Sequence, residues 1–173
     1  RATPRYPRSA RTLYLSAGTQ ISLRAAQNSD FYLCLNDDVE LQPGAIHALL
    51  DVHSNAENPE TIIVGATCDP DCGKTCTGGM KRKNWFNVRV MDPEDSPVPC
   101  DTFNGNIVLI PSQVKEKLGL LDENYTHFFA DGDYGLRAAR EGIPLLLAPG
   151  YLATCKLNPL AGSSFDSSLS IGQ

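Results

Sequence analysis

The sequence lacks long hydrophobic runs and has no overall excess of positive charge. No apolar stretch approaches the roughly 20 residues that cross a bilayer, and no secretory signal is recognisable at its start. The net charge is −5, although Arg1, Arg5, Arg8 and Arg11 crowd the first eleven positions, so the rest of the chain carries −9. An acidic body argues against broad nucleic-acid binding, which requires a basic face.

Length and composition indicate a single globular domain between two tails. The 173 residues, 42% of them apolar, are enough to bury a core. Residues 1–11, rich in Arg and Pro, read either as a flexible basic tail or as a contact for a membrane or a polyanion. Residues 12–157 form the expected domain. Residues 158–173, rich in Ser and Gly, are expected to be loosely ordered.

The six cysteines do not follow the pattern of a disulfide scaffold. Cys68, Cys72 and Cys76 form C-x3-C-x3-C, which differs from the C-x2-C pairs of zinc sites, and no nearby histidine completes a ligand set. Whether these three bind metal stays open at this point. Cys34 lies in an apolar run and is expected to act as a small buried hydrophobe. Reduced thiols in a cytoplasmic protein are therefore expected.

Strand and helix patterns alternate along the chain and predict an α/β fold. Apolar and β-branched runs mark the strands, and i, i+3, i+4 spacing or flanking Gly marks the helices. A long irregular stretch, about 66–99, is expected to be functional or inserted and to hold a strand from Phe86 to Val90. The expected strands are 12–15, 31–35, 61–64, 107–110 and 145–147, and the expected helices are 18–26, 45–52, 112–118 (Ser112 as N-cap, ended by Gly119) and 131–141.

The most informative stretch is Asn36-Asp37-Asp38, directly behind the predicted strand 31–35. Polar residues at the carboxyl end of a buried strand lie where α/β sheets bind ligands. Two adjacent carboxylates repel each other unless a cation or hydrogen bonds compensate, and a hard divalent cation prefers oxygen ligands. The alternative is an ordinary turn, since Asn and Asp are common turn residues.

A second acidic cluster, Asp131-Gly132-Asp133, opens the predicted helix 131–141. A carboxylate in the first turn is stabilised in its ionised form by the helix dipole and by free N–H groups. It could therefore accept a proton in catalysis, or it could simply cap the helix.

Several ordered segments together resemble the family-2 glycosyltransferases of the GT-A fold, especially rhamnosyltransferase-like bacterial members. The resemblance covers roughly residues 12–155. The segments are SDFYLCLNDDVEL (29–41), PGA (43–45), NGNIVLIP (104–111), GLLDENY (119–125), FADGDYGLR (129–137), EGIP (141–144) and LAPG (147–150). The expected fold is accordingly an incomplete GT-A domain, an α/β fold with a Rossmann-like mixed sheet flanked by helices.

The resemblance implies inverting transfer of a sugar from a nucleotide-diphosphate donor to a glycan or lipid-linked acceptor, assisted by Mg²⁺ or Mn²⁺. It also implies a bacterial, cytoplasmic role in polysaccharide biosynthesis, with peripheral membrane association as one option. The roles it implies are a catalytic base at Asp131, a metal ligand at Asp38, donor diphosphate binding by Asn36, Asp37 and Asp38, and an acceptor or sugar pocket from Asn104, Gly105, Asn106 and Asp133.

The sequence departs from the family pattern in three places. Ala130 replaces a residue that is more usually acidic or Gly. Cys155 stands where many relatives place a metal- or phosphate-binding His. The usual amino-terminal third, which holds the nucleotide base and ribose, is not recognisable, so the chain alone is expected to bind donor poorly or to be inactive.

Two alternatives follow from these departures and from the acid pair. The first is a non-catalytic carbohydrate- or nucleotide-binding remnant of the same fold. The second is a metal-dependent phosphohydrolase or nucleotidyltransferase that uses Asp37 and Asp38 as a two-metal site. Such sites usually need further acids or histidines, and His47, His53 and His127 do not cluster with Asp38 in the sequence. His127 is expected either near the active site or in a structural role.

Overall fold

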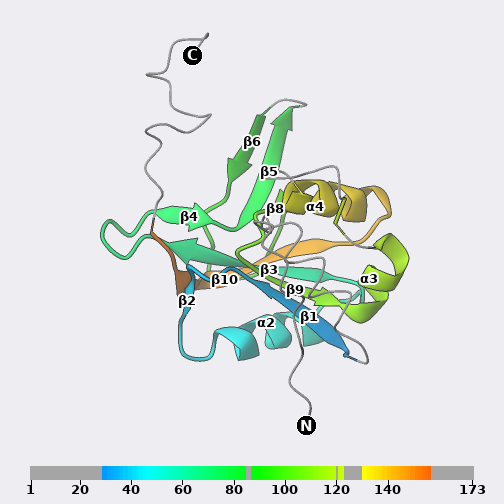
Figure 1. Ribbon diagram of the computed structural model, residues 1–173, viewed down its shortest axis with the longest axis horizontal. Coiled ribbons are helices and arrows are strands. Elements are labelled where there is room, and N and C mark those ends of the chain that lie inside the picture. The colour runs from blue at the N-terminus through cyan, green and yellow to red at the C-terminus, as the bar shows by residue number, and fades with distance from the viewer. Residues whose placement is uncertain (1–28, 85–86, 120, 123–129, 157–173) are drawn as a thin grey trace, which may run out of the picture.

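The computed structural model of the chain describes residues 29–84, 87–119, 121–122 and 130–156. These residues form a mixed α/β fold, in agreement with the predicted α/β class (Figure 1). The elements in chain order are β1 (Phe31–Leu35), β2 (Glu40–Leu41), α2 (Ala45–Ser54), β3 (Ile62–Cys68), β4 (Thr75–Thr77), β5 (Gly79–Asn84), β6 (Asn87–Val90), β7 (Val98–Pro99), β8 (Thr102–Phe103), β9 (Ile107–Pro111), α3 (Ser112–Leu118), α4 (Ala130–Arg140) and β10 (Leu145–Thr154).

The main sheet has the strand order β1-β9-β3-β10-β2, with β4 added to β3 and β7 added to β10. Strand β9 runs antiparallel to both of its neighbours, β1 and β3, whereas β3 and β10 are parallel. This arrangement brings the carboxyl ends of β1, β3 and β10 to the same end of the sheet as the amino end of β9. Segments that are far apart in the sequence therefore meet there.

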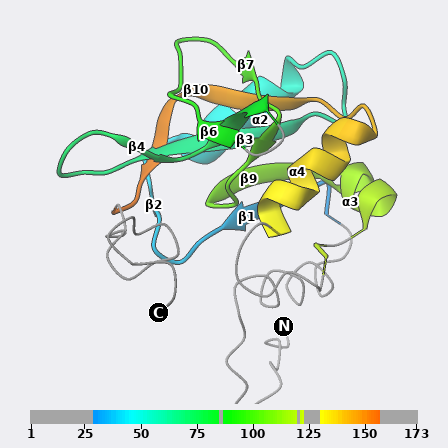
Figure 2. The ribbon, with the colours of Figure 1, turned by 90° about the horizontal axis from the view of Figure 1, so that it is seen from above.

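Both faces of the main sheet are covered, and the side chains alternate between them. Along β3, Ile62 and Val64 pack in a core cluster with Tyr134 and Ala138 of α4, whereas Ile63 packs in a second cluster with Leu49 of α2. A strand that is buried on both faces reads as a continuous apolar run, which explains why β3 and β9 are recognisable in the sequence. Figure 2 shows α2 on one side of the sheet and both α3 and α4 on the other.

A second, three-stranded sheet has the order β6-β5-β8. Its strands β5 and β6 form an antiparallel hairpin that extends away from the main sheet (Figure 1). This hairpin lies inside the long stretch that was expected to be functional or inserted. The predicted strand there is confirmed over Asn87–Val90, while Phe86 lies outside the described residues.

The predicted helices 45–52, 112–118 and 131–141 correspond to α2, α3 and α4. Gly119 and Gly142 follow α3 and α4 with φ of 74°, the left-handed backbone that favours glycine at a helix end. The prediction that Ser112 is an N-cap is wrong. Ser112 is the first helical residue, and Pro111, which cannot supply a side-chain acceptor, holds the cap position.

The last strand is longer than the predicted 145–147, because β10 continues to Thr154. Pro149 and Gly150 read as strand breakers in the sequence, and in the structure they occupy an irregularity in the pairing with β3. The register moves there from Leu147 opposite Val64 to Tyr151 opposite Ala66. The extra residues of a bulge allow the strand to pass a Pro-Gly pair and to continue.

Other predictions lie outside the described residues. They are the basic tail 1–11, the strand 12–15, the helix 18–26, the segment 158–173 and any role of His127. Within the described residues, none of the helices combines the length and the apolar character required to traverse a bilayer.

Candidate functional site

The end of the main sheet where β1 and β10 finish and β9 begins gathers most of the polar residues singled out in the sequence. We call it the polar end of the sheet, defined by Asn36, Asp38, Asn106, Asp131 and Cys155. Antiparallel pairing of β1 with β9 places Leu35 opposite Ile107, so the residues just beyond this pair face each other.

Asn36 is held by the loop that precedes β9. Its main-chain N–H donates to the carbonyl of Asn106 at 3.2 Å, and its side-chain Nδ2 donates to Oδ1 of Asn106 at 2.7 Å. Asn106 is buried, with 9% of its surface exposed, and its own Nδ2 lies 3.7 Å from the Cys155 sulfur. The two asparagines therefore connect the end of β1 with the end of β10.

Asp131 lies in the first turn of α4 and contacts the same loop. Its Oδ2 accepts a hydrogen bond from the Gly105 N–H at 2.7 Å, and its Oδ1 accepts one from the Gly132 N–H at 2.8 Å. A carboxylate has about four acceptor positions, so two are left for an incoming hydroxyl. Asp131 can therefore cap the helix and still accept a proton.

The position of α4 over this loop depends on Thr102, a residue that the sequence analysis did not single out. Its buried hydroxyl donates to the Gly132 carbonyl at 2.6 Å. Thr102 belongs to the two-residue strand β8, which is too short to show a pattern in the sequence. We therefore assign Thr102 a positioning role for the helix that carries Asp131.

Asp37 and Asp38 lie in the turn after β1, and both are exposed. Burial raises the pKa of the Cys155 thiol, and the negative charge of Asp38 raises this pKa further. Asp38 also follows Asn36 by two residues, so it lies near the end of β1 that Asn36 joins to Asn106. Asp131 contacts the loop of residues 104–106 directly through Gly105, whereas Asp38 is connected to this loop only through Asn36, two residues earlier in the chain.

Asn104, in the same loop, has an unsatisfied group. Its main-chain N–H donates to the Gly78 carbonyl at 3.0 Å, but its buried Oδ1 has no hydrogen-bond partner among the residues described. Buried acceptors without partners are uncommon in native proteins, and each one calls for an explanation. A ligand hydroxyl or amide that donates to this oxygen would satisfy it.

Asp133, which was expected to line the acceptor pocket, is engaged within its own helix. Its Oδ2 accepts from the Arg137 Nε at 2.8 Å, and Arg137 also donates to the Leu118 carbonyl at 2.9 Å. An i, i+4 pair of this kind stabilises the helix surface. Residues two apart on a helix point in different directions, so Asp131 and Asp133 do not form a paired-carboxylate site.

Two of the three histidines lie on α2. His47 is exposed. His53 packs edge-on against Phe31, with ring centroids 4.7 Å apart, and its Nε2 lies 3.0 Å from the Pro59 carbonyl. His47 therefore lies on an exposed face of α2, and His53 lies in its last turn.

Cysteines also gather near the polar end. The Cys155 N–H donates to the Cys68 carbonyl at 3.0 Å, and the Cys76 thiol donates to the Cys155 carbonyl at 2.9 Å. Burial is the main cause that raises the pKa of Cys76 to about 11, so its thiol is protonated at neutral pH. Over the described part of the chain, no three His, Cys, Asp or Glu side chains are grouped so that they could hold a metal ion by themselves.

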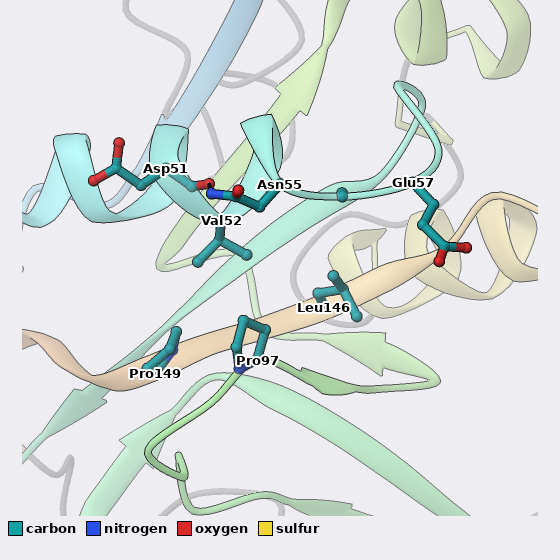
Figure 3. A pocket seen from close by; sticks show the side chains of 8 residues that line it. Asp51, Val52, Asn55, Glu57, Pro97, Leu146 and Pro149 are labelled. Carbon is teal, nitrogen blue, oxygen red and sulfur yellow. Dashed lines mark hydrogen bonds between the residues drawn. The ribbon is translucent and has the colours of Figure 1, made fainter.

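A hollow of about 520 Å³ lies elsewhere, between the carboxyl end of α2 and β10 (Figure 3). Val52 of α2 and Leu146 of β10 point toward each other across it, with Pro97 and Pro149 beside them. Asp51 and Glu57 supply acidic groups at its edge. None of the residues predicted to be functional lines this hollow.

A scan of the chain against protein-family models found no match, and a comparison with curated proteins found none either.

Proposed function

We propose that the protein is an inverting glycosyltransferase of the GT-A type. It would transfer a sugar from a nucleotide-diphosphate donor to a glycan or lipid-linked acceptor. The observation that carries this proposal is the meeting of Asn36, Asn106 and Asp131 at one loop, with Asp38 two residues after Asn36 in the chain.

The chemistry of such a transfer needs two groups that this arrangement can supply. The acceptor hydroxyl must lose a proton as it attacks the anomeric carbon, and a positioned carboxylate typically contributes ~10²–10⁴-fold to such a step. Asp131 has two acceptor positions left after its bonds to Gly105 and Gly132. Attack from the face opposite the departing diphosphate inverts the configuration of the sugar.

The second need is to offset the charge that grows on the departing diphosphate. Asp37 and Asp38 are exposed carboxylates, which suits a hard divalent cation such as Mg²⁺ or Mn²⁺. Mg²⁺ is commonly held by one or two carboxylates together with substrate phosphates. Asp38 would therefore hold such a cation together with the donor phosphates, with Asp37 next to it, and when bound the cation would neutralise phosphate charge.

Asn104 and Asn106 would contact the sugar or the acceptor. The unsatisfied Oδ1 of Asn104 can accept a hydrogen bond from a sugar hydroxyl. Gly105 between them has no side chain, and a Cβ there would lie 3.2 Å from the Asp131 Cβ. The glycine thus allows the loop to approach the proposed base closely.

Because the chain alone is expected to bind donor poorly, the test is an assay of the protein as its complete gene encodes it, including any segment before Arg1. The assay uses a panel of nucleotide-diphosphate sugars in the presence of Mn²⁺ or Mg²⁺. We expect at least one donor to release its nucleoside diphosphate in a metal-dependent manner, with inverted configuration at the anomeric carbon of the product. If none of these donors binds with either metal, the proposal is wrong.

A second candidate function is a non-catalytic binding domain of the same fold. Ala130, directly before the proposed base, favours it. Saturable binding of a donor without release of nucleoside diphosphate, with or without acceptor sugars, would support this candidate over the enzyme.

A further inference from the structure

The hairpin of β5 and β6 is strongly basic in an otherwise acidic chain. Residues 81–89 include Lys81, Arg82, Lys83 and Arg89 and no acidic residue, whereas the whole chain has a net charge of −5. These four side chains and Val88 line a hollow of about 570 Å³. Among the residues that the structure describes, positive charge is thus most concentrated on this hairpin.

The register of the hairpin places like charges opposite each other. Lys81 pairs with Arg89 across the two strands, and Lys83 lies at an irregularity of the pairing between Arg82 and Asn84. Like charges directly opposite in an antiparallel pair are destabilising. An anion on this face would relieve the repulsion.

One acidic residue opposes part of this charge. Asp101 accepts from the Lys81 Nζ at 3.2 Å and from the Arg82 main-chain N–H at 2.8 Å. Lys83 and Arg89 form no ion pair with any residue in the described ranges, and both are exposed. These two side chains are therefore available to an external anion.

The shape of the element favours a flat partner. The hairpin extends away from the main sheet (Figure 1), so it can touch a surface while the acidic body stays back from it. Electrostatic repulsion of the body decays over a Debye length of about 8–10 Å in physiological salt. A nucleic acid long enough to wrap would bring its phosphates against that acidic body.

We propose that the β5–β6 hairpin is a docking element for a membrane surface rich in anionic phospholipid. Lys83 and Arg89 contact the lipid headgroups, and Lys81 adds to the local positive potential. The choice of a bilayer also rests on the proposed function, because a lipid-linked acceptor lies in a membrane. The Asn104 N–H donates to Gly78, the residue just before β5, so the hairpin joins the fold beside the proposed sugar pocket.

The test is sedimentation of the full chain with vesicles of phosphatidylcholine alone or of phosphatidylcholine mixed with phosphatidylserine. We expect binding only to the acidic vesicles and a decrease with added salt. Each charge near an acidic bilayer is worth about a fivefold change in binding. The double variant Lys83→Ala with Arg89→Ala should therefore bind about 25-fold more weakly.

A matched control removes two exposed charges elsewhere, Lys74→Ala with Arg140→Ala, so both variants have the same net charge. Equal binding by the two variants would overturn the proposal, since the basic segment 1–11 or the overall charge would then account for binding. Binding of single-stranded DNA that depends on Lys83 and Arg89, without vesicle binding, would also overturn it. The assay contains no sugar nucleotide, so its outcome is independent of whether the chain turns over a donor.

Discussion

The interior of the main sheet and its polar end are made by the same strands but from different kinds of contact. Within β9, Ile107 to Ile110 are buried among apolar side chains from both faces of the sheet. One residue earlier, Asn106 accepts two hydrogen bonds from Asn36 and contacts Cys155. Apolar packing is non-directional and tolerates small shifts, whereas hydrogen bonds between polar groups require particular positions.

This difference leads to separate expectations for the two regions. Substitutions in the interior should change the free energy of unfolding and leave the chemistry of the folded molecules unchanged. Substitutions at the polar end should change donor binding or turnover with smaller effects on stability. The predictions below test this separation.

The largest effect is expected for Asp131→Asn. The substitution keeps the size of the side chain but removes the proposed proton acceptor, so turnover should fall ~10²–10⁴-fold while donor affinity is largely retained. Turnover is measured by nucleoside diphosphate release, and donor affinity by calorimetry.

Asp95→Asn, which changes an exposed carboxylate on the connection between β6 and β7, is the matched control and should behave as the wild type. An Asp131→Asn protein with unchanged turnover would remove Asp131 from the base role.

A pair of glycine substitutions compares the two regions directly. At Gly65, an added Cβ would lie 2.6 Å from Ile107 Cγ2 in the cluster on the α2 side, so Gly65→Ala should destabilise the protein by about 1–3 kcal/mol through overpacking. At Gly105, an added Cβ would meet the Asp131 Cβ at 3.2 Å and its Oδ2 at 3.5 Å. Because small misplacements of a reacting group are costly, Gly105→Ala should lower turnover about tenfold.

Chemical denaturation and initial-rate measurements on both variants check these expectations. We expect a stability loss with normal turnover per folded molecule for Gly65→Ala, and the reverse for Gly105→Ala. If Gly105→Ala lowers stability as much as Gly65→Ala does and leaves turnover intact, the separation between the regions fails.

An effect smaller than that of Asp131→Asn is expected for Asp38→Ala. Loss of a carboxylate that would hold the cation should weaken metal-dependent donor binding by at least about tenfold. Donor titrations with and without Mn²⁺ measure the effect. Glu40→Ala, at an exposed carboxylate in β2, is the nearby control. Identical titrations for Asp38→Ala and the wild type in the presence of metal would exclude this role.

The interior was more readily predicted from the sequence than the connections around it. The elements β3, β9 and α4 were predictable from the sequence, because continuous apolar runs mark buried strands and flanking glycines mark helix ends. The two-residue strands β7 and β8 carry no pattern, and the Pro149-Gly150 pair hid the second half of β10. Such short or interrupted strands depend on tertiary pairing, which local sequence does not encode.

The polar end could be foreseen only in part. Asn36, Asn106 and Asp131 were singled out by their places after a strand or at a helix start and by the family resemblance, and the structure brings them to one loop. The contacts of Cys155 with Cys68 and Cys76 were not foreseen. They follow from the pairing of β10 with β3, which joins residues more than 80 positions apart.

The smallest effect concerns the interior at high pH. Burial raises the pKa of the Cys100 thiol to about 12 from its ordinary value of 9.0. Above pH 9 the unfolded chain loses this proton while the folded protein keeps it. The contribution of this thiol to the free energy of unfolding is therefore fully present below pH 9 and is lost as the pH rises toward 12. Between pH 8 and pH 10 this group should cost about 1.4 kcal/mol of unfolding free energy.

Denaturant unfolding of the reduced protein at pH 8 and pH 10 measures this loss, and Cys100→Ala should lose about 1.4 kcal/mol less over the same interval. The variant should still lose some stability, because Cys34, whose pKa burial raises to about 11, keeps its own contribution. Turnover per folded molecule should be the same in both proteins, since Cys100 packs against Gly79 in the interior. If the two proteins lose equal stability between pH 8 and pH 10, Cys100 ionises in the folded state as readily as in the unfolded chain, and that corner of the interior is open to water.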